Sequence, residues 1–155
     1  MRKAKERSPS VIELLKEDHE YVKKSYRNFE KMDPEEDREA VQALVGEVCK
    51  ALEVHARVEE EVVYPALRRA MADGEMIEEA LIEHDSAKTL IRRLKRMKPT
   101  DRAYIPTFTV LCEYVLHHVK EEEGEIFPKA QRSRVNLRSL GQKLMNRKLK
   151  LLRRA

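Results

Sequence analysis

Cysteine, glycine and aromatic residues are scarce in this sequence, and each scarcity excludes a class of protein. The chain of 155 residues has two cysteines, four glycines and no tryptophan. Two cysteines without a CxxC spacing exclude a disulfide scaffold and argue against zinc or thioredoxin-like chemistry, so we expect Cys49 and Cys112 to be buried free thiols. So few glycines disfavour a turn-rich β architecture.

Long apolar runs are also absent. No stretch approaches the roughly 20 residues that a membrane helix needs, and the N-terminal MRKAKERSPS lacks the apolar middle of a secretory signal. We therefore expect a soluble, cytoplasmic protein without a transmembrane segment. The length predicts one compact domain.

Charged residues, in contrast, make up 39% of the chain and are unevenly distributed. Residues 132–155 contain nine Lys or Arg and no acid, which leaves an acidic balance in residues 1–131 although the net charge is +4. No aromatic side chains interleave the basic segment, which argues against nucleic-acid recognition. The basicity belongs to one tail and not to the body of the protein.

Apolar residues recur at helical spacing and predict an all-α protein. We expect helices from Ser10, with Glu13 as a capping box, to about Met32, and from Asp33-Pro34 to Asp73-Gly74. Two more are expected over about 75–97 and 102–130. Because the connections are short, residues 1–131 should form an up-and-down antiparallel four-helix bundle. In 132–155 we expect a basic amphipathic helix, beginning near Asn136, that packs on the bundle.

An internal repeat supports two copies of one helical hairpin. The segment from His55 to Pro65, with Glu59, Glu60 and Tyr64, returns 63 residues later from His118 to Pro128, with Glu122, Glu123 and Phe127. Upstream, His19 and His84 each precede a methionine by 13 residues, and Cys49 and Cys112 each precede the repeated histidine by six. The two hairpins should be related by a pseudo-twofold axis.

Each predicted helix carries one histidine on its apolar face. Glu59 and Glu122 follow their histidines by four residues, so both carboxylates share that inward face. One such histidine alone is more often a hydrogen-bonded core residue, but two buried carboxylates beside four imidazoles need compensating charge, which a pair of divalent cations supplies. This donor set fits iron or manganese better than a closed zinc site. The predicted metal ligands are His19, His55, Glu59, His84, His118 and Glu122.

Other metal motifs are excluded by spacing. The sequence has no HExxH of metalloproteases, and no histidine follows a glutamate at the ExxH spacing of ferritin-like di-iron bundles. His117 lies on a different helical face, so we expect it at the surface or beside the site. Among the acids near the ligands, Glu60-Glu61 and Glu121–Glu123 could orient imidazole N–H groups.

The residues resemble the hemerythrin-like HHE cation-binding family over about residues 10–130. That family has a histidine on the first helix, HxxxE on the second, a histidine on the third and HxxxE on the fourth. The resemblance implies a non-haem di-iron centre with an oxo or hydroxo bridge; manganese is the alternative metal. It also implies His19 and His55 on one metal, His84 and His118 on the other, and Glu59 and Glu122 as bridging ligands.

One position departs from the oxygen-carrying members of that family. They have a further histidine one turn after the third-helix ligand, where this chain has Lys88. The departure implies open metal positions, which suit binding or activation of dioxygen, peroxide or nitric oxide more than reversible oxygen storage. Lys88 could instead coordinate or cover the open position, or remain a solvated lysine beside it.

Two function classes follow. The first is a metal-binding protein that handles or senses iron, dioxygen or nitric oxide; catalysis, sensing and storage all remain open within it. The second is a helical interaction module with at most a structural metal, which binds an acidic partner through its basic C-terminal helix. That helix could also dock on a second subunit of a dimer or on anionic lipid.

Overall fold

The computed structural model describes residues 8–72 and 74–154. Residues 1–7, 73 and 155 lie outside the description, and Asp73 is one of the two residues at which the second helix was predicted to stop. Helices make up nearly all of the described chain, and these ranges contain no strand. In chain order they are α1 (Val11–Glu30), α2 (Arg38–Val58), the π-helical turn η1 (Glu59–Val63), α3 (Tyr64–Ala70), α4 (Gly74–Arg96), α5 (Tyr104–Glu121), the π-helical turn η2 (Glu122–Ile126), α6 (Phe127–Arg132) and α7 (Leu137–Arg153).

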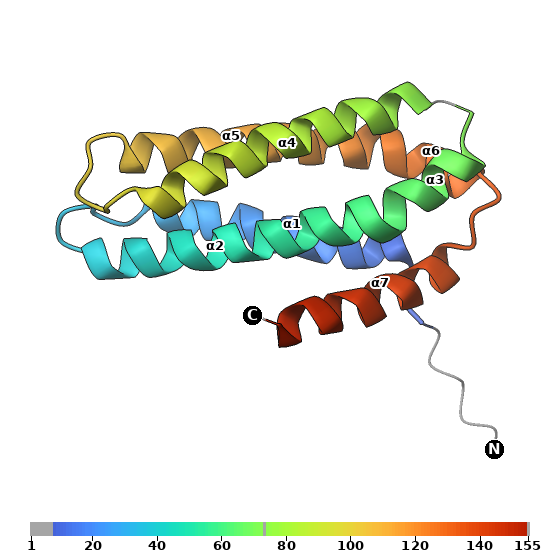
Figure 1. Cartoon of the computed structure of the whole chain (residues 1–155), viewed down its shortest axis with the longest axis horizontal. Coiled ribbons are helices and arrows are strands. Elements are labelled where there is room, and N and C mark those ends of the chain that lie inside the picture. Colours follow the sequence, from blue (N-terminus) through green and yellow to red (C-terminus); the bar gives the residue numbers. More distant parts are fainter. Residues whose placement is uncertain (1–7, 73, 155) are drawn as a thin grey trace, which may run out of the picture.

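These helices build four antiparallel rods and one additional helix (Figure 1). The first rod is α1, and the second consists of α2, η1 and α3. The third rod is α4, and the fourth consists of α5, η2 and α6. The α1–α2 and α4–α5 connections lie at one end of the bundle and the α3–α4 connection at the other. The predicted up-and-down helical bundle is therefore confirmed. The basic helix α7 packs against α1, α2 and η1.

The start of α1 follows the predicted capping box. The Ser10 hydroxyl accepts from the backbone N–H of Ile12 at 3.2 Å, and the Ser10 N–H donates to Glu13 at 3.3 Å. Two N–H groups that the first helical turn leaves without partners are thus satisfied.

The start of α2 was predicted wrongly, because the helix begins at Arg38 and not at Pro34. The Asp33 carboxylate accepts from the N–H groups of Glu35 and Glu36 at 2.8 and 3.2 Å. The Asp33 N–H in turn donates to Asp37 at 2.9 Å. These side-chain contacts compete with helical bonding and hold the segment as a turn.

The core consists of two apolar clusters, one toward each end of the bundle. The first surrounds Leu15, Tyr64 and Phe127, and the second surrounds Phe29 and Phe108. On each rod, the predicted histidine lies between residues of the first cluster and residues of the second. A polar layer therefore separates two hydrophobic regions. Both cysteines are buried free thiols in the second cluster, as predicted.

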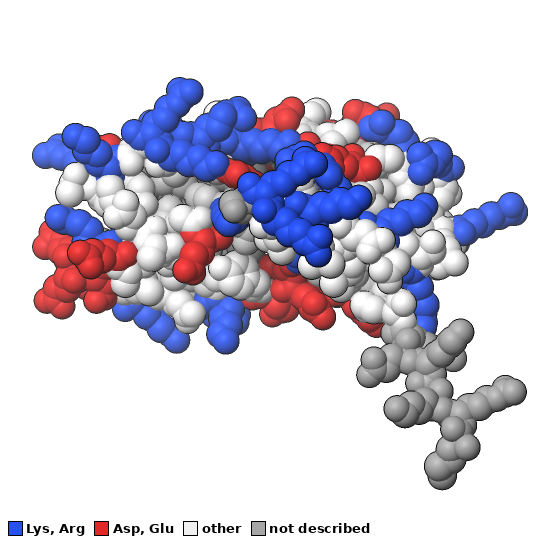
Figure 2. Space-filling view, turned by 60° about the horizontal axis from the view of Figure 1, so that its bottom comes forward, with Lys and Arg blue, Asp and Glu red and all other residues white. Residues whose placement is uncertain are grey.

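Helix α7 attaches to the bundle by an apolar stripe. Asn136 caps it by accepting from the Ser139 N–H at 3.0 Å, and Leu140, Leu144 and Leu151 are buried. Figure 2 brings this side of the molecule forward and shows Lys and Arg side chains gathered over it. None of the helices in the described ranges combines the length and apolar character that a membrane crossing requires.

Candidate metal centre

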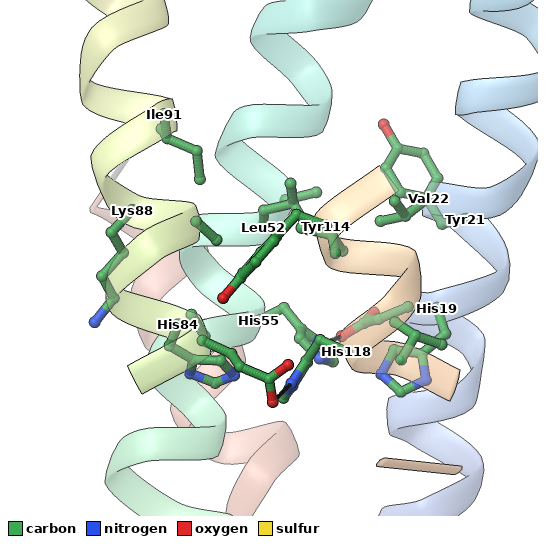
Figure 3. A pocket seen from close by; sticks show the side chains of 17 residues that line it. His19, Tyr21, Val22, Leu52, His55, His84, Lys88, Ile91, Tyr114 and His118 are labelled. Atoms are coloured by element: carbon green, nitrogen blue, oxygen red, sulfur yellow. Dashed lines mark hydrogen bonds and ion pairs between the residues drawn. The ribbon is translucent and has the colours of Figure 1, made fainter. Parts of the chain in front are cut away.

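The six predicted ligands meet in the polar layer between the two apolar clusters. His19, His84 and His118 are buried, His55 is half-buried, and Glu59 and Glu122 are fully enclosed. Figure 3 shows the four imidazoles turned toward one another from four different helices. His117, in contrast, is 65% exposed and pairs with Glu121 on the outer face of α5, consistent with its prediction as a surface residue.

The six side chains form two groups with closely spaced donor atoms. His19, His55 and Glu122 make the first half-site, and Glu59, His84 and His118 make the second half-site; within each, the donor atoms lie within 4.8 Å of one another. Each half-site takes two histidines from one hairpin and its carboxylate from the other. Three donors at this spacing match the size of one metal ion.

Each glutamate also contacts the half-site to which it does not belong. Oε1 of Glu59 lies 2.8 Å from Nε2 of His55 and 3.4 Å from Nε2 of His84. Oε1 of Glu122 lies 3.3 Å from Nε2 of His19, and its Oε2 lies 3.2 Å from Nε2 of His118. Both carboxylates therefore stand between the half-sites, which is the position of a ligand that bridges two metals.

The carboxylates are buried without adequate hydrogen bonds. Both oxygens of Glu59 and Oε1 of Glu122 have no oriented donor, and neither imidazole nitrogen of His19 makes a hydrogen bond. Unsatisfied charge in the interior is costly. A pair of divalent cations would satisfy these atoms, and neutral imidazoles with carboxylates are ligands that iron and manganese accept. The residues present thus fit a two-metal centre.

The charges within the layer shift the pKa values of His55, His84, His118 and Glu59. Burial alone would lower the pKa of His55, but the charge of Glu59 and a hydrogen bond to Asp18 outweigh it and raise the pKa to about 10. Burial is likewise outweighed at His118, where Glu122 raises the pKa to about 9. The pKa of Glu59 is held well below its ordinary value, against its own burial, by His55 and His84. In the metal-free protein, protonated imidazoles thus supply the positive charge that metal ions would bring.

Two of the imidazoles are oriented by an acid that precedes a ligand histidine. Asp18, next to His19, lies with Oδ2 2.8 Å from Nδ1 of His55. Glu83, next to His84, lies with Oε1 3.0 Å from Nδ1 of His118. Sequence reasoning missed both acids, although their shared position directly before the α1 and α4 histidines was a signal.

The other two imidazoles each lie beside an acid that directly follows Glu59 or Glu122 in the sequence. Oε2 of Glu60 lies 3.1 Å from Nδ1 of His84, and Oε1 of Glu123 lies 3.4 Å from Nδ1 of His19. An Nδ1–H held by a carboxylate leaves the Nε2 lone pair free for a metal. Hydrogen bonds at Nδ1 thus direct the Nε2 atoms of His55, His84 and His118 to the inner side of the layer.

The π-helical turns place the glutamates. The Tyr64 N–H bonds to the carbonyl of Glu59, and the Phe127 N–H bonds to that of Glu122, five residues apart in each case. A proline follows each aromatic residue, and a proline cannot donate to the carbonyl four residues before it. The predicted continuous helices over 33–73 and 102–130 are therefore interrupted, and the interruptions begin at Glu59 and Glu122.

Tyr64 is a site residue that sequence reasoning noted only as part of an aromatic-Pro pair. Its hydroxyl donates to Oε2 of Glu122 at 2.5 Å and lies 3.3 and 3.4 Å from Nε2 of His84 and His118. Burial and the neighbouring carboxylates raise its pKa well above the ordinary value. Its repeat counterpart Phe127 has no hydroxyl and stacks on His19 with ring centroids 5.9 Å apart. The second half-site therefore has an oxygen that the first lacks.

Lys88 is directed away from the metal-facing atoms. Its ammonium forms a short ion pair with Oε1 of Glu60, the acid whose other oxygen contacts His84. The amine thus acts on the charge of the orienting acid and is not in a position to coordinate.

A cavity of about 60 Å³ opens onto the layer from the side of the second apolar cluster. The four histidines form its floor, and Val22, Leu52, Ile91, Tyr114 and Val115 belong to its apolar walls (Figure 3). A space of this size accommodates a molecule of two or three atoms but not an organic substrate.

Comparisons with known proteins agree with this geometry. The hemerythrin HHE cation-binding domain model matches residues 10–130. Curated relatives include a DNA nickase from Nostoc sp., 27% identical over 118 residues, and a hemerythrin-like protein from Schizosaccharomyces pombe, 25% identical over 120 residues. Each match covers 76% of this chain, but it spans only 32% and 58% of those two proteins.

A solved structure is similar over nearly the whole chain. It is the crystal structure of a hemerythrin HHE cation-binding domain-containing protein from Mycobacterium kansasii, with a TM-score of 0.78 and 25% identity. The match covers 92% of this chain and 87% of that one. Because residues 1–130 amount to a smaller share, the match extends into the C-terminal helix as well.

Proposed function

The chain belongs to the hemerythrin HHE cation-binding domain family, and on this premise we propose that it holds two iron ions and uses them to bind or reduce a diatomic molecule, dioxygen or nitric oxide. His19 and His55 would hold one ion, His84 and His118 the other, and Glu59 and Glu122 would bridge them. Manganese is the alternative metal.

The position of the two glutamates carries the proposal. Each carboxylate is enclosed and contacts one histidine from each of the two half-sites. Three of the four carboxylate oxygens have no oriented hydrogen-bond donor. A core that needed only hydrogen-bonded histidines would gain nothing from two such carboxylates, because their desolvation opposes folding. Two cations at the half-sites would reverse that cost.

The residues of this chain have separate tasks around such ions. A bound iron pair supplies one-electron chemistry. Asp18, Glu60 and Glu83 hold the Nδ1–H groups of three histidines and so keep their Nε2 atoms directed inward. The small apolar cavity excludes bulk water and larger substrates, which favours an uncharged diatomic ligand.

Metal stoichiometry is the first test. After anaerobic incubation with ferrous iron and desalting, elemental analysis should give about two irons per chain, and none or one in His55→Ala and Glu59→Ala. His117→Ala is the matched control, because it removes an exposed histidine next to a predicted ligand. Unchanged iron in both site variants, or equal loss in the control, would contradict the ligand assignment.

Reactivity is the second test. The loaded ferrous protein should react with one equivalent of nitric oxide or dioxygen and change its visible spectrum, whereas the metal-free protein should not. Leu52→Phe places a larger side chain in the cavity wall and leaves all proposed ligands unchanged in sequence. It should slow the reaction at unchanged iron content. An identical rate in that variant would exclude the cavity as the route of access.

The outer face of α7 supports a second candidate function, binding of an acidic partner. The side chains of Lys143, Lys150 and Arg153 are exposed. Two apolar residues of this face are also exposed, Leu149 to 48% and Leu152 to 46%. Duplex DNA is the polyanion to test first, because one relative is a DNA nickase. Salt-dependent DNA binding by the wild type, lost in a Lys143→Gln, Lys150→Gln, Arg153→Gln triple variant that retains its iron, would support this function; no binding at low salt would exclude DNA as the partner.

A further inference from the structure

The basic helix α7 reaches the polar layer through one of its lysines. Nζ of Lys148 lies 2.7 Å from Oδ1 of Asp18. The other oxygen of Asp18 is the one that lies 2.8 Å from Nδ1 of His55. A continuous series of contacts therefore runs from a helix outside the four-helix bundle to a predicted metal ligand inside it.

Both oxygens of Asp18 are used in this series. A carboxylate near the surface of a helix ordinarily turns among several rotamers. Here the ammonium on one side and the imidazole on the other hold it in a single orientation, and Asp18 is less than a quarter exposed. Without Lys148, only His55 would hold the carboxylate in place.

The second half-site has a comparable arrangement, but its lysine comes from within the bundle. Lys88 on α4 pairs with one oxygen of Glu60, and the other oxygen lies 3.1 Å from Nδ1 of His84. The two half-sites thus share a histidine–carboxylate–lysine series. In the first half-site, Asp18 takes its lysine from α7, outside the four-helix bundle, whereas Glu123 beside His19 has Lys23 of α1 at 3.7 Å.

We propose that α7 completes the first half-site, with Lys148 as a positioning residue that holds Asp18 against His55, so that docking of α7 sets how tightly this half-site retains its ion. The inference rests on the proposed two-iron centre and extends it. It makes the two half-sites unequal, because displacement of α7 by a partner would weaken the first half-site and leave the second intact.

The expected size of the effect follows from what orienting groups do at metal sites. Loss of a residue that directly orients a ligating histidine costs 10–100-fold in metal affinity. Lys148 acts one contact farther out, so its removal should cost about 10-fold, confined to one of two ions.

The test compares Lys148→Met with Arg147→Met by anaerobic ferrous titration against a competing chelator. Arg147 is a matched control because it also joins α7 to the bundle, through Glu61 at 2.5 Å, and Glu61 keeps Arg57 at 2.9 Å as a second partner. Wild type and Arg147→Met should show two tight ions. Lys148→Met should retain one tight ion and bind the other about 10-fold more weakly, at unchanged helical circular dichroism.

Lys148→Arg and Lys88→Met complete the design. The arginine keeps a cation at Asp18 and should restore much of the lost affinity, which a general loosening of α7 would not allow. Lys88→Met should weaken one ion in the otherwise intact protein, and combination with Lys148→Met should weaken both.

The outcomes are distinct. Two unchanged tight ions in Lys148→Met, or equal weakening in Arg147→Met, would overturn the role of Lys148 while leaving the two-iron centre in place. No tight ion in the wild type would overturn the proposed function, and this inference with it.

Discussion

A single hydroxyl group breaks the twofold symmetry of the centre. Tyr64 and Phe127 occupy the same position in the repeat, but only Tyr64 places an oxygen near Glu122, His84 and His118. The half-sites therefore differ both in this oxygen and in the lysine that supports them.

Replacement of that tyrosine tests how much its hydroxyl contributes. Tyr64→Phe removes the donor to a buried carboxylate, and a hydrogen bond to a charged group contributes about 1.5–3 kcal/mol. We expect the free energy of unfolding of the metal-free protein to fall by about 2 kcal/mol in urea denaturation. Tyr26→Phe, in the second apolar cluster, is the control and should change it by less than about 0.5 kcal/mol. Equal losses of unfolding free energy in the two variants would contradict a stabilising hydrogen bond from the Tyr64 hydroxyl to Glu122.

The thiols give a prediction of chemical reactivity. Burial raises the pKa of Cys49 to about 11 and that of Cys112 to about 12. Since each pKa unit lowers the thiolate fraction tenfold, a thiol-reactive disulfide reagent at pH 8 should label the folded protein at least about 100-fold more slowly than the unfolded chain. In guanidinium chloride two equivalents should react at once; rapid labelling of the folded protein would contradict the buried positions.

The same thiols make the free energy of unfolding fall at alkaline pH. Their pKa values are raised on folding, so their contribution is fully present below the unfolded value of about 9. It is lost as the pH rises through 11 to 12.

Much of the candidate site could be predicted from individual residues, and the reason is local geometry. A histidine and a glutamate four residues apart share a helical face, so Glu59 and Glu122 were found with their histidines. Asp18 and Glu83 were missed because each orients a histidine of the next helix, a contact that depends on how helices pack and not on spacing in one helix.

At the scale of elements, an aromatic-Pro pair accounts for each of the two π-helical turns, which begin at Glu59 and Glu122. The sequence contained both prolines, Pro65 and Pro128, as the last residues of the two repeat copies. The turn itself was not predicted, because a π-helical turn and an ordinary helix share the same apolar pattern. Its cause is the missing N–H of proline, which favours the five-residue bond from Tyr64 to Glu59.

Two glycines in helices give opposite predictions. A Cβ on Gly141 of α7 would lie 2.5 Å from the carbonyl oxygen of Pro9 and 3.0 Å from the nitrogen of Val11, both backbone atoms that cannot move aside. Gly141→Ala should therefore lower the free energy of unfolding by about 1–3 kcal/mol. Gly46→Ala in α2, with nothing within 4 Å of its Cβ, should raise it by about 0.5–1 kcal/mol. Chemical denaturation of both variants checks the pair; a Gly141→Ala protein as stable as the wild type would mean that α7 does not dock this closely.

At the scale of the molecule, metal and fold should stabilise each other. Ligands that bind only the folded state add about 2.7 kcal/mol per site at a concentration 100 times Kd. For a chain of this size, each occupied site raises the midpoint of thermal unfolding by about 5–10 °C. With ferrous iron we therefore expect a rise of about 10–20 °C in the wild type, its reversal by a chelator, and at most half that rise in Glu59→Ala.

The architecture was the most predictable level. Four amphipathic segments with short connections leave few alternatives to an antiparallel bundle, and the 63-residue repeat indicated its internal symmetry. Helix α7 was expected to pack on the bundle, although its basic face also suits a second subunit or a lipid surface. The contacts of Lys148 and Arg147 with acids of α1 and η1 decide for the bundle.

The exchange of carboxylates between the hairpins has a consequence for the integrity of the molecule. Each half-site needs a glutamate from the opposite hairpin, so neither hairpin could assemble a complete set of ligands by itself. The ions would therefore cross-link the two hairpins, because each ion would be bound by residues of both. A protein cut by a protease in the α3–α4 connection keeps its shared apolar core, but its two fragments should separate at a lower urea concentration after a chelator removes the metal than while they are loaded.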